Sequence, residues 1–437
     1  MILRRRTQTR PAEEIRTTYV TQWFPPEPAQ ISDGIARSLK ERGHDVTVLT
    51  GIPNYPTGIV PEGFRAWRSS LTDLDGIHVR RAPLYPSHDS SAIKRMVNYV
   101  SWAVSATLYG RRVLRQADVA IVYSGPATAA LPVMVWHRLC RTPYVLMIQD
   151  LWPDSVLATG FLTRGIPRRL ASTTLTWFCR WAYRSAAHVI AISPGAVQML
   201  VERGVDREKI SLVYNWAQES IASSTADVRD ARTLLGVPVG AFVVSYAGNH
   251  GAAQGLDVVL RAAARLNEHP DITFLFVGDG MEAEHLRDLC KSLGCRNVVF
   301  HGPVSHENMS FVQAASDIQL ICLTADPLFR ITMPSKVQSI LASGTASIAV
   351  AEGDAARVVE ESGAGWSVAP GDDATLAAVI QAAHAEGNDA MSARGEAGRA
   401  YYRRYMSQDV GASRLDQILR RAAGRPTKPA QKAGISS

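Results

Sequence analysis

The sequence predicts an α/β protein with two doubly wound domains, each built on a parallel sheet. The first observation is the order strand, turn, helix, strand between Ile15 and Thr50, a βαβ unit whose two strands must be parallel. The second is that the same alternation begins again at Phe242, after the Ser-, Ala- and Asp-rich segment Gln218–Asp230. The third is length, because 437 residues, of which 46% are hydrophobic, allow two or three domains with cores of their own.

The first domain is expected over residues 17–225. Its first helix, Ile31–Arg42, has apolar residues three and four positions apart and stops before Gly43, a residue suited to the position after a helix. Its strands are short apolar runs of the buried type, expected at Ile15–Gln22, Asp45–Thr50, Ala117–Tyr123, Tyr144–Ile148, His188–Ile192 and Ile210–Asn215.

The second domain is expected over residues 226–399. Strands are expected at Phe242–Ala247, Thr273–Val277, Val298–His301, Ile318–Cys322 and Ser347–Val350, with helices at Leu256–Leu266, Glu282–Leu293 and Lys336–Ala342. A helix over about residues 400–423 is expected to pack back on the first domain. Residues 1–16 and 426–437 are expected to be flexible tails.

Composition excludes several classes of protein. A chain that is 46% hydrophobic and 20% charged is not disordered as a whole. Val119–His137 is long enough to span a membrane, but Gly125 and two prolines predict a strand, a turn and a helix instead. No apolar segment follows the arginines of Met1–Arg16, so no secretory signal is expected. The five cysteines form no disulfide or zinc pattern, and no metal site is expected.

Positive charge is concentrated between Ser90 and Val201. This window contains twelve basic and three acidic residues, and five of the nine tryptophans: Trp102, Trp136, Trp152, Trp177 and Trp181. Cations beside aromatic rings on amphipathic helices suit an anionic membrane surface, because the cation meets lipid phosphate and the ring lies at headgroup level. A nucleic-acid patch has the same composition, and a solvated basic face over core tryptophans is the structural alternative.

In the second domain, two strand-to-helix loops predict an anion site. Asn249, His250 and Gly251 follow the strand that ends at Ala247, and Gly278-Asp279-Gly280 follows the next strand. Glycines allow a ligand to approach the backbone, and N–H groups at a helix start attract anions. Each loop, taken alone, is also compatible with an ordinary turn between a strand and a helix.

A third loop of the second domain carries two cations. Pro334 suits a helix start, which places Lys336 in the first turn, and Arg330 precedes it. A lysine there opposes the helix dipole, and a polyanionic ligand would explain the position. The alternative is a surface loop with two solvated cations.

In the first domain, Asp150 and Asp154 follow the strand Tyr144–Ile148 and are two of the few acids in the basic window. Carboxylates at the end of a parallel strand are candidates for binding hydroxyls or for proton transfer. Helix capping or a surface position is the alternative, above all for Asp154.

These features together resemble the retaining glycosyltransferases of family 4. The resemblance covers about residues 17–423 and rests on Gln22–Pro28, Arg42–Val46, Ser193–Met199, Val213–Asn215, Gly278–Gly280, Val298–Gly302, Ala315–Asp317 and Ala342–Gly344. Asp150-Leu-Trp-Pro-Asp154 and Met333-Pro-Ser-Lys336 are most similar to the branch that builds bacterial surface polysaccharide, with transferases of N-acetyl-fucosamine and colanic-acid units. The resemblance implies the GT-B fold, two Rossmann-like doubly wound domains facing across a cleft.

The resemblance also implies an activity. A sugar would pass from a nucleotide sugar, UDP-linked, to a polyprenyl-diphosphate-linked sugar with retention, in O-antigen, capsule or exopolysaccharide synthesis. The enzyme would be cytoplasmic and peripheral on the inner face of the membrane, held there by residues 90–201, with no cofactor and no nucleic-acid partner. Asp150, Arg330 and Lys336 would be catalytic. The His301–Val304 loop would face the base, and Glu307 or Gln338 would contact the ribose.

Several family positions differ in this chain. The Arg and Lys that the family places after the first strand of the second domain are Asn249 and Gln254, and the family's two glutamates align with Ile331 and Ser339. The alternatives are a transferase with a soluble acceptor, a nucleotide-sugar epimerase on the same fold, and a non-catalytic partner subunit.

Overall fold

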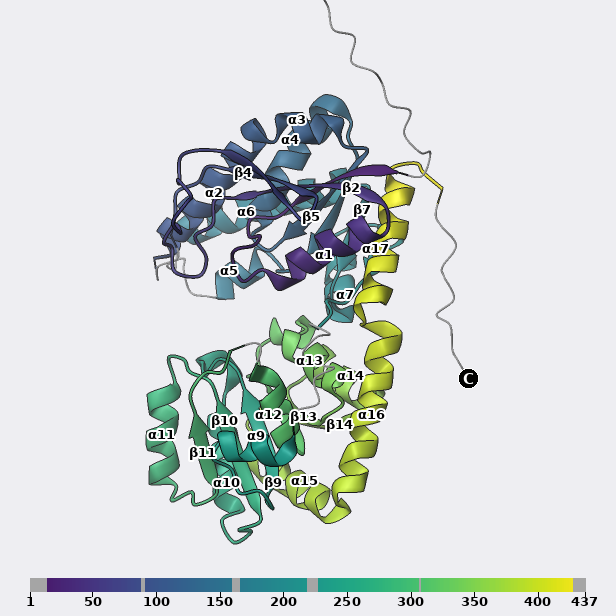
Figure 1. Cartoon of the computed structure of the whole chain (residues 1–437). Helices are drawn as coiled ribbons and strands as arrows, with labels where there is room; N and C mark the ends of the chain where they lie inside the picture. Colours follow the sequence, from purple (N-terminus) through teal and green to yellow (C-terminus); the bar gives the residue numbers. More distant parts are fainter. Residues whose placement is uncertain (1–13, 88–90, 159–165, 218–226, 306–307, 427–437) are drawn as a thin grey trace, which may run out of the picture. The chain divides into compact units, whose positions relative to one another are not determined.

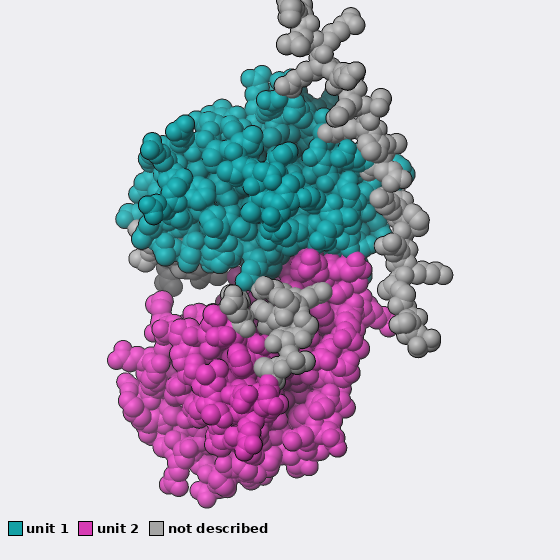
Figure 2. Space-filling view, viewed as in Figure 1, with its two compact units in different colours: residues 1–192, 197–213, 411–437 teal, residues 193–196, 214–410 magenta. Residues whose placement is uncertain are grey.

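The computed structural model describes residues 14–87, 91–158, 166–217, 227–305 and 308–426, and they form two compact units (Figure 1). Unit 1 contains the chain up to Ile192, Val197–Val213 and the residues from Gly411 on, and unit 2 contains Ser193–Ala196 and Tyr214–Val410 (Figure 2). Apart from the short segment Ser193–Ala196, the chain therefore passes from unit 1 to unit 2 after Val213 and returns at Gly411.

Unit 1 is built on an eight-stranded sheet in the order β3-β4-β2-β1-β5-β6-β7-β8. All neighbouring strands are parallel except the antiparallel pair β3 and β4. The strands are β1 (Ile15–Val20), β2 (His44–Gly51), β3 (Ser70–Leu74), β4 (Ile77–Ala82), β5 (Val119–Ser124), β6 (Tyr144–Ile148), β7 (His188–Ala191) and β8 (Ile210–Leu212). Its helices are α1 (Gln30–Glu41), α2 (Ala92–Tyr109), α3 (Arg111–Gln116), α4 (Leu131–Cys140), α5 (Asp154–Ala158), α6 (Ile166–Ser185), α7 (Pro194–Glu202) and α17 (Gln408–Ala422).

Unit 2 is built on a six-stranded, fully parallel sheet in the order β11-β10-β9-β12-β13-β14. The strands are β9 (Phe242–Ala247), β10 (Ile272–Val277), β11 (Val298–His301), β12 (Ile318–Cys322), β13 (Ala346–Val350) and β14 (Gly365–Val368). The helices are α9 (Val228–Leu234), α10 (Asp257–Arg265), α11 (Ala283–Ser292), α12 (Met309–Ala315), α13 (Ser335–Ser343), α14 (Asp354–Glu361), α15 (Asp373–Glu386) and α16 (Asn388–Tyr405). Every residue of β10, β12 and β13 is buried, as expected for parallel strands covered by helices on both faces.

The main chain follows most of the expected elements and adds some. The single helix expected over about residues 400–423 is instead the end of α16 followed by α17, and only the residues from Gly411 on belong to unit 1. The strand expected to run from Ile210 to Asn215 ends at Leu212. The hairpin of β3 and β4 and the edge strand β14 were not expected. The hairpin turns at Asp75 and Gly76, both of positive φ (53° and 75°), as in the tight turns that suit two twisted antiparallel strands.

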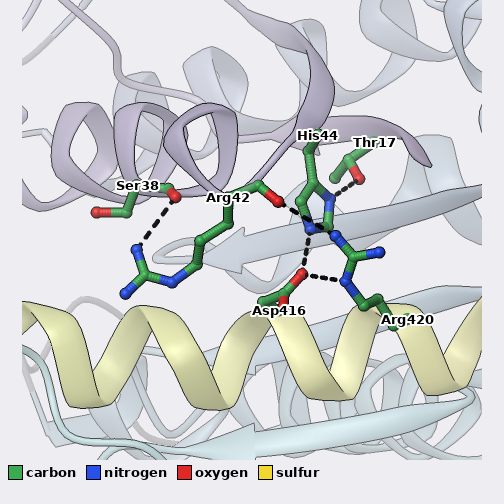
Figure 3. A network of polar contacts seen from close by, with 6 residues as sticks. All are labelled: Thr17, Ser38, Arg42, His44, Asp416 and Arg420. Atoms are coloured by element: carbon green, nitrogen blue, oxygen red, sulfur yellow. Dashed lines mark hydrogen bonds and ion pairs between the residues drawn. The ribbon is translucent and has the colours of Figure 1, made fainter. Parts of the chain in front are cut away.

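Helix α17 is held against strand β2 by a buried polar network (Figure 3). Thr17 Oγ1 and His44 Nδ1 share a hydrogen bond of 2.7 Å, and His44 Nε2 lies 2.7 Å from Asp416 Oδ1. Arg420 Nε donates to the same oxygen at 2.6 Å, and Arg420 Nη2 donates to the carbonyl of Arg42 at 3.2 Å. Burial acts to raise the pKa of Asp416, but the hydrogen bonds and charges of His44 and Arg420 hold this pKa below its usual value.

Two features are absent from the described part of the chain. None of the helices they form is both long and apolar enough to cross a bilayer. No three His, Cys, Asp or Glu side chains among them are grouped so that they could hold a metal ion.

Candidate active site

The loops after β9 and β10 lie against each other at the carboxyl edge of the unit 2 sheet. The backbone N–H of His250 donates to the carbonyl of Asp279 at 2.8 Å, and the N–H of Glu282 donates to the carbonyl of His250 at 2.9 Å. The approach is so close that a Cβ on Gly278 would lie 2.0 Å from the carbonyl oxygen of Gly248. The structure therefore brings six of the candidate residues into one place: Asn249, His250, Gly251, Gly278, Asp279 and Gly280.

His250 is buried in this group. Its exposed fraction is 1%, and neither ring nitrogen makes a hydrogen bond to any described residue. The ring centroid lies 6.0 Å from that of Tyr246 and 6.2 Å from that of Phe276. Burial, and then the charge of Lys336, lower the pKa of His250. The neutral imidazole has one N–H donor and one acceptor nitrogen, and a buried polar group without a partner costs about 1–3 kcal/mol.

Lys336 brings a cation to the same edge from the first turn of α13. Its Nζ lies 3.5 Å from the centroid of the Tyr246 ring. A Cβ at Gly248, whose φ is 138°, would lie 2.9 Å from that Nζ, so glycine leaves the space that the ammonium uses. Among the described residues no carboxylate pairs with Lys336. Burial lowers the pKa of Lys336 to about 7 because the charged form loses solvation there.

Arg330 is placed differently from Lys336. Its side chain is exposed, and its Nε lies 2.6 Å from Oε2 of Glu352. The loop was expected to present two cations, and in the structure one of them is already paired with a carboxylate. Glu352 was not singled out from the sequence, because it follows β13 and lies 22 residues further along the chain.

Three residues are expected near the nucleotide base and ribose: Val304, Glu307 and Gln338. Gln338 is buried, and with its amide nitrogen turned toward the helix start it donates to the carbonyls of Pro334 (2.8 Å) and Ser335 (3.2 Å). The Gln338 amide is thereby occupied within its own helix. Val304 packs against a hydrophobic cluster that includes Val312. Glu307 lies outside the described residues.

The position in the sheet explains why these groups meet. Strand β9 pairs with β10 on one side and with β12 on the other, so the loops that follow β9 and β12 leave the sheet in different directions. Ligands of doubly wound sheets bind at such a switch point, outside the carboxyl ends of the strands. Here the site offers a cation, a neutral histidine and the backbone of two glycine-rich loops, which together suit a diphosphate.

Unit 1 places Asp150 after β6. The backbone N–H of Asp150 lies 3.4 Å from the carbonyl of Ser124, at the end of β5. Surrounding protein raises the pKa of Asp150 to about 6, although the residue still has an exposed surface. Asp154 instead begins α5 and forms an ion pair with Arg203. Asp154 therefore takes the alternative of a position at a helix start, whereas Asp150 remains a candidate for binding a hydroxyl or transferring a proton.

Two family profiles match the chain. Residues 28–216 match the profile described as a glycosyl transferase 4-like domain. Residues 241–386 match the profile described as glycosyl transferases group 1. The two matches fall on unit 1 and unit 2 in turn.

Individual relatives agree with the profiles. The chain is 30% identical over 319 residues to the putative colanic acid biosynthesis glycosyl transferase WcaI of Escherichia coli, covering 72% of this chain and 77% of that protein. It is 25% identical over 270 residues to the probable glycosyltransferase WbjE of Pseudomonas aeruginosa, covering 61% and 66%. Anabaena HepE, whose crystal structure is a complex with UDP and glucose, has a TM-score of 0.65 at 19% identity, covering 92% and 98%. At that identity the likeness to HepE concerns the fold.

Proposed function

This chain is a family 4 glycosyltransferase of the surface-polysaccharide type with the GT-B fold, and we propose that it transfers a sugar from a UDP-sugar to a polyprenyl-diphosphate-linked sugar. The observation that carries the donor half is Lys336, a partly buried cation with no carboxylate partner among the described residues, beside two glycine-rich loops. The complex of Anabaena HepE with UDP and glucose supports UDP as the nucleotide.

The proposed chemistry is the departure of a diphosphate from the anomeric carbon. The glycosidic bond breaks through an oxocarbenium-like state, and negative charge grows on the leaving UDP. Lys336, His250 and backbone N–H groups would stabilise that charge in fixed positions, which is the largest contribution such a site can make. With retention, a leaving phosphate oxygen takes the proton of the acceptor hydroxyl. The proposal includes no cofactor and no metal ion.

The acceptor half of the proposal rests on unit 1, with Asp150 in contact with the acceptor. A carboxylate at the end of β6 can accept a hydrogen bond from an attacking or neighbouring hydroxyl. Because its pKa is raised to about 6, Asp150 is ionised at neutral pH and still close to the range in which it exchanges protons.

The lipid part of the acceptor is supported by helix α2. Five apolar residues spaced three or four apart lie along one face of this helix, with exposed fractions from 44% to 77%: Ile93, Val97, Val100, Val104 and Leu108. This set is called the α2 stripe. In water an apolar stripe of this length is costly, and it suits the boundary between lipid headgroups and acyl chains.

The elements packed around α2 supply charge and aromatic rings. Helix α2 contacts α3 and α4, and α4 contacts α6. Arg111, Arg112 and Arg115 of α3 are exposed, and no described carboxylate pairs with them. Trp177 and Trp181 of α6 are exposed side by side, with ring centroids 5.5 Å apart. Of the other tryptophans in the window, Trp102 and Trp152 are buried and Trp136 donates to the carbonyl of Thr107. These features support the proposal that the enzyme binds the inner face of the membrane through this part of unit 1.

A donor and acceptor screen tests the proposal. The full-length protein is incubated with UDP-, GDP- and dTDP-linked sugars and a panel of polyprenyl-diphosphate-linked monosaccharides, and products are identified by mass spectrometry. Transfer from a UDP-sugar to a lipid-linked sugar, with NMR showing the donor's anomeric configuration in the product, supports the proposal. Transfer only to soluble sugars contradicts the proposed lipid-linked acceptor, and transfer with inversion contradicts the proposed retention. No heat with any nucleotide in isothermal titration contradicts the donor half.

A further inference from the structure

Four aromatic rings of unit 1 form a connected group next to Asp150. Trp23 follows β1, Tyr55 follows β2, Tyr99 lies on α2 and Trp152 follows β6. The ring centroids are 5.5 Å apart for Trp23 and Tyr55, 6.1 Å for Trp23 and Tyr99, and 6.2 Å for Tyr99 and Trp152. Trp152 is buried, whereas the other three rings keep exposed surface. This set is called the aromatic group.

The aromatic group lies where the unit 1 sheet changes direction. Strand β1 pairs with β2 on one side and with β5 on the other, so the loops after β1 and β5 diverge at the carboxyl edge. A Cβ on Gly125, directly after β5, would lie 3.0 Å from the Trp23 ring. The indole therefore lies across the switch point, the position at which doubly wound sheets bind ligands.

A buried carboxylate fixes the two loops that carry Trp23 and Tyr55. Glu27 is 6% exposed. Its Oε1 accepts from the N–H groups of Asn54 and Tyr55, both at 2.9 Å, and its Oε2 accepts from the N–H of Phe24 at 3.1 Å. One side chain thus joins the loop after β1 to the loop after β2. The loops that carry Trp23 and Tyr55 are thus held by a satisfied buried carboxylate, which limits how far they can move when nothing is bound.

The chemistry of the aromatic group favours a neutral sugar over an anion. Tyr99 and Asp150 are close enough to interact electrostatically, so a carboxylate stands beside the rings. A negative charge there repels phosphate, whereas it accepts hydrogen bonds from hydroxyl groups. Aromatic faces pack against the C–H face of a pyranose, and tyrosine hydroxyls add polar contacts at its edge.

We propose that Trp23, Tyr55 and Tyr99 bind the sugar ring of the acceptor, with Asp150 receiving the hydrogen bond of one of its hydroxyls. This deepens the proposed function, on which it rests, by naming the residues that select the acceptor. Tyr99 is on the same helix as the α2 stripe, at a position facing the protein. A lipid-linked acceptor in the bilayer would therefore have its first sugar within reach of the rings.

Direct binding tests this without requiring transfer. Full-length protein with UDP present is titrated with hexyl glycosides of glucose, galactose and N-acetylglucosamine, and tryptophan fluorescence gives Kd. We expect saturable binding of at least one glycoside, weakened at least tenfold by Trp23→Leu and by Tyr55→Ala. Trp67→Ala, which removes an exposed tryptophan of unit 1 outside the aromatic group, is the matched control and leaves Kd within twofold.

Kinetics separate this inference from the proposed function. In the transfer assay, Tyr55→Ala raises the KM for the acceptor at least tenfold and leaves UDP affinity within twofold of wild type. Asp150→Asn lowers kcat instead. The inference is overturned if no hexyl glycoside binds, or if acceptor KM and glycoside Kd are unchanged in variants that transfer sugar and melt like wild type. An enzyme that binds glycosides through these rings but transfers to no lipid-linked sugar contradicts the proposed function alone.

Discussion

Lys336 has no carboxylate partner among the residues that the structure describes. Its ammonium lies against the Tyr246 ring, in the first turn of a helix whose dipole opposes positive charge. Burial removes solvation from the ammonium and lowers the pKa of Lys336 to about 7, and contact with the ring offsets this only in part. The diphosphate of the proposed donor would supply the opposite charge.

We predict that Lys336→Ala lowers kcat/KM for the donor strongly. A charge-assisted contact to the leaving diphosphate is worth about 2–4 kcal/mol, or roughly a 30- to 1000-fold loss of rate. Arg330→Ala should have a smaller effect, because the Arg330 charge is exposed and already paired with Glu352. Steady-state kinetics on both variants, with melting temperatures as the control for folding, check this. Wild-type rates for Lys336→Ala would exclude the lysine from the donor site.

Donor binding should take up a proton above pH 7. Below that pH Lys336 is charged before the donor arrives, whereas above it the amine must be protonated as the diphosphate binds, so affinity falls as pH rises. The titratable neighbours of Lys336 should keep their protonation state in this pH range. Burial lowers the pKa of His250, raises the pKa of Cys322 to about 12 and raises the pKa of Tyr246 above its usual value.

Calorimetry with UDP-glucose in HEPES and in Tris at pH 8 measures this uptake, since the two buffers differ in ionisation enthalpy. Lys336→Arg, which stays charged, is the control and should bind with no uptake from this site. Equal proton uptake by the wild-type and arginine forms would show that another group titrates.

The sequence located much of this site and left parts of it open. Loops after parallel strands have to share one edge, so placing His250, Asp279 and Lys336 together needed only the strand pattern. The pairing of Arg330 with Glu352 depends on the path of a different loop, which no local pattern records. Gln338 was expected to contact the ribose because the sequence does not show that its amide is hydrogen-bonded to carbonyls at the start of its own helix.

At the scale of elements, the two opposite faces of α2 have different surroundings. Asn98, Trp102 and Ala106 face the protein, and Gln22 Nε2 donates to Asn98 Oδ1 at 2.6 Å. The α2 stripe faces outward. This division into a buried and an exposed face follows from helical periodicity, so it could be predicted from the sequence. The membrane surface was predicted instead from the positive charge of the same window.

We predict that Val100→Glu together with Leu108→Glu weakens binding to anionic vesicles at least tenfold. Each substitution places a carboxylate where the apolar face would enter the lipid. The added negative charge also reduces the attraction of the α3 arginines for anionic lipid. Sedimentation with phosphatidylglycerol-containing vesicles measures the effect. Leu234→Glu, at an exposed leucine of α9 in unit 2, is the control and should bind like wild type. Unchanged binding of the double variant would remove α2 from the membrane surface.

The elements that were not expected have local causes. Strand β3 is short and has no buried residue, so it lacks an apolar pattern. The turn residues Asp75-Gly76 are the signal that could have identified its hairpin with β4. Strand β14 is an edge strand of four residues with only Val368 fully buried, so its apolar pattern is weak. The central strands were located closely because burial on both faces makes them continuous apolar runs.

At the scale of the whole molecule, Asp416 joins parts of the chain that are 372 residues apart (Figure 3). Asp416, His44 and Arg420 are each less than a tenth exposed. Removing the carboxylate leaves a guanidinium and an imidazole buried without their acceptor, which is more costly than the pair itself is stabilising.

We predict that Asp416→Ala destabilises unit 1 by about 3–5 kcal/mol, measured by urea unfolding. Asp288→Ala, which removes an exposed partner of Lys291, is the control and should change stability by less than about 1 kcal/mol. Because the folded pKa of Asp416 is below its unfolded value, its contribution is complete above about pH 4 and is lost as pH falls through the folded pKa. A variant as stable as the control would mean that the network contributes nothing to folding.

Because the chain returns to unit 1 at its end, the order of synthesis affects when unit 1 can be completed. A ribosome releases the β2 region, with His44, long before it makes α17, so the imidazole has no Asp416 while the whole of unit 2 is being synthesised. The first unit begun is thus the last to be completed. Shortened products that stop before Gly411 would contain every strand of both sheets and still lack the helix that closes the polar network of the first.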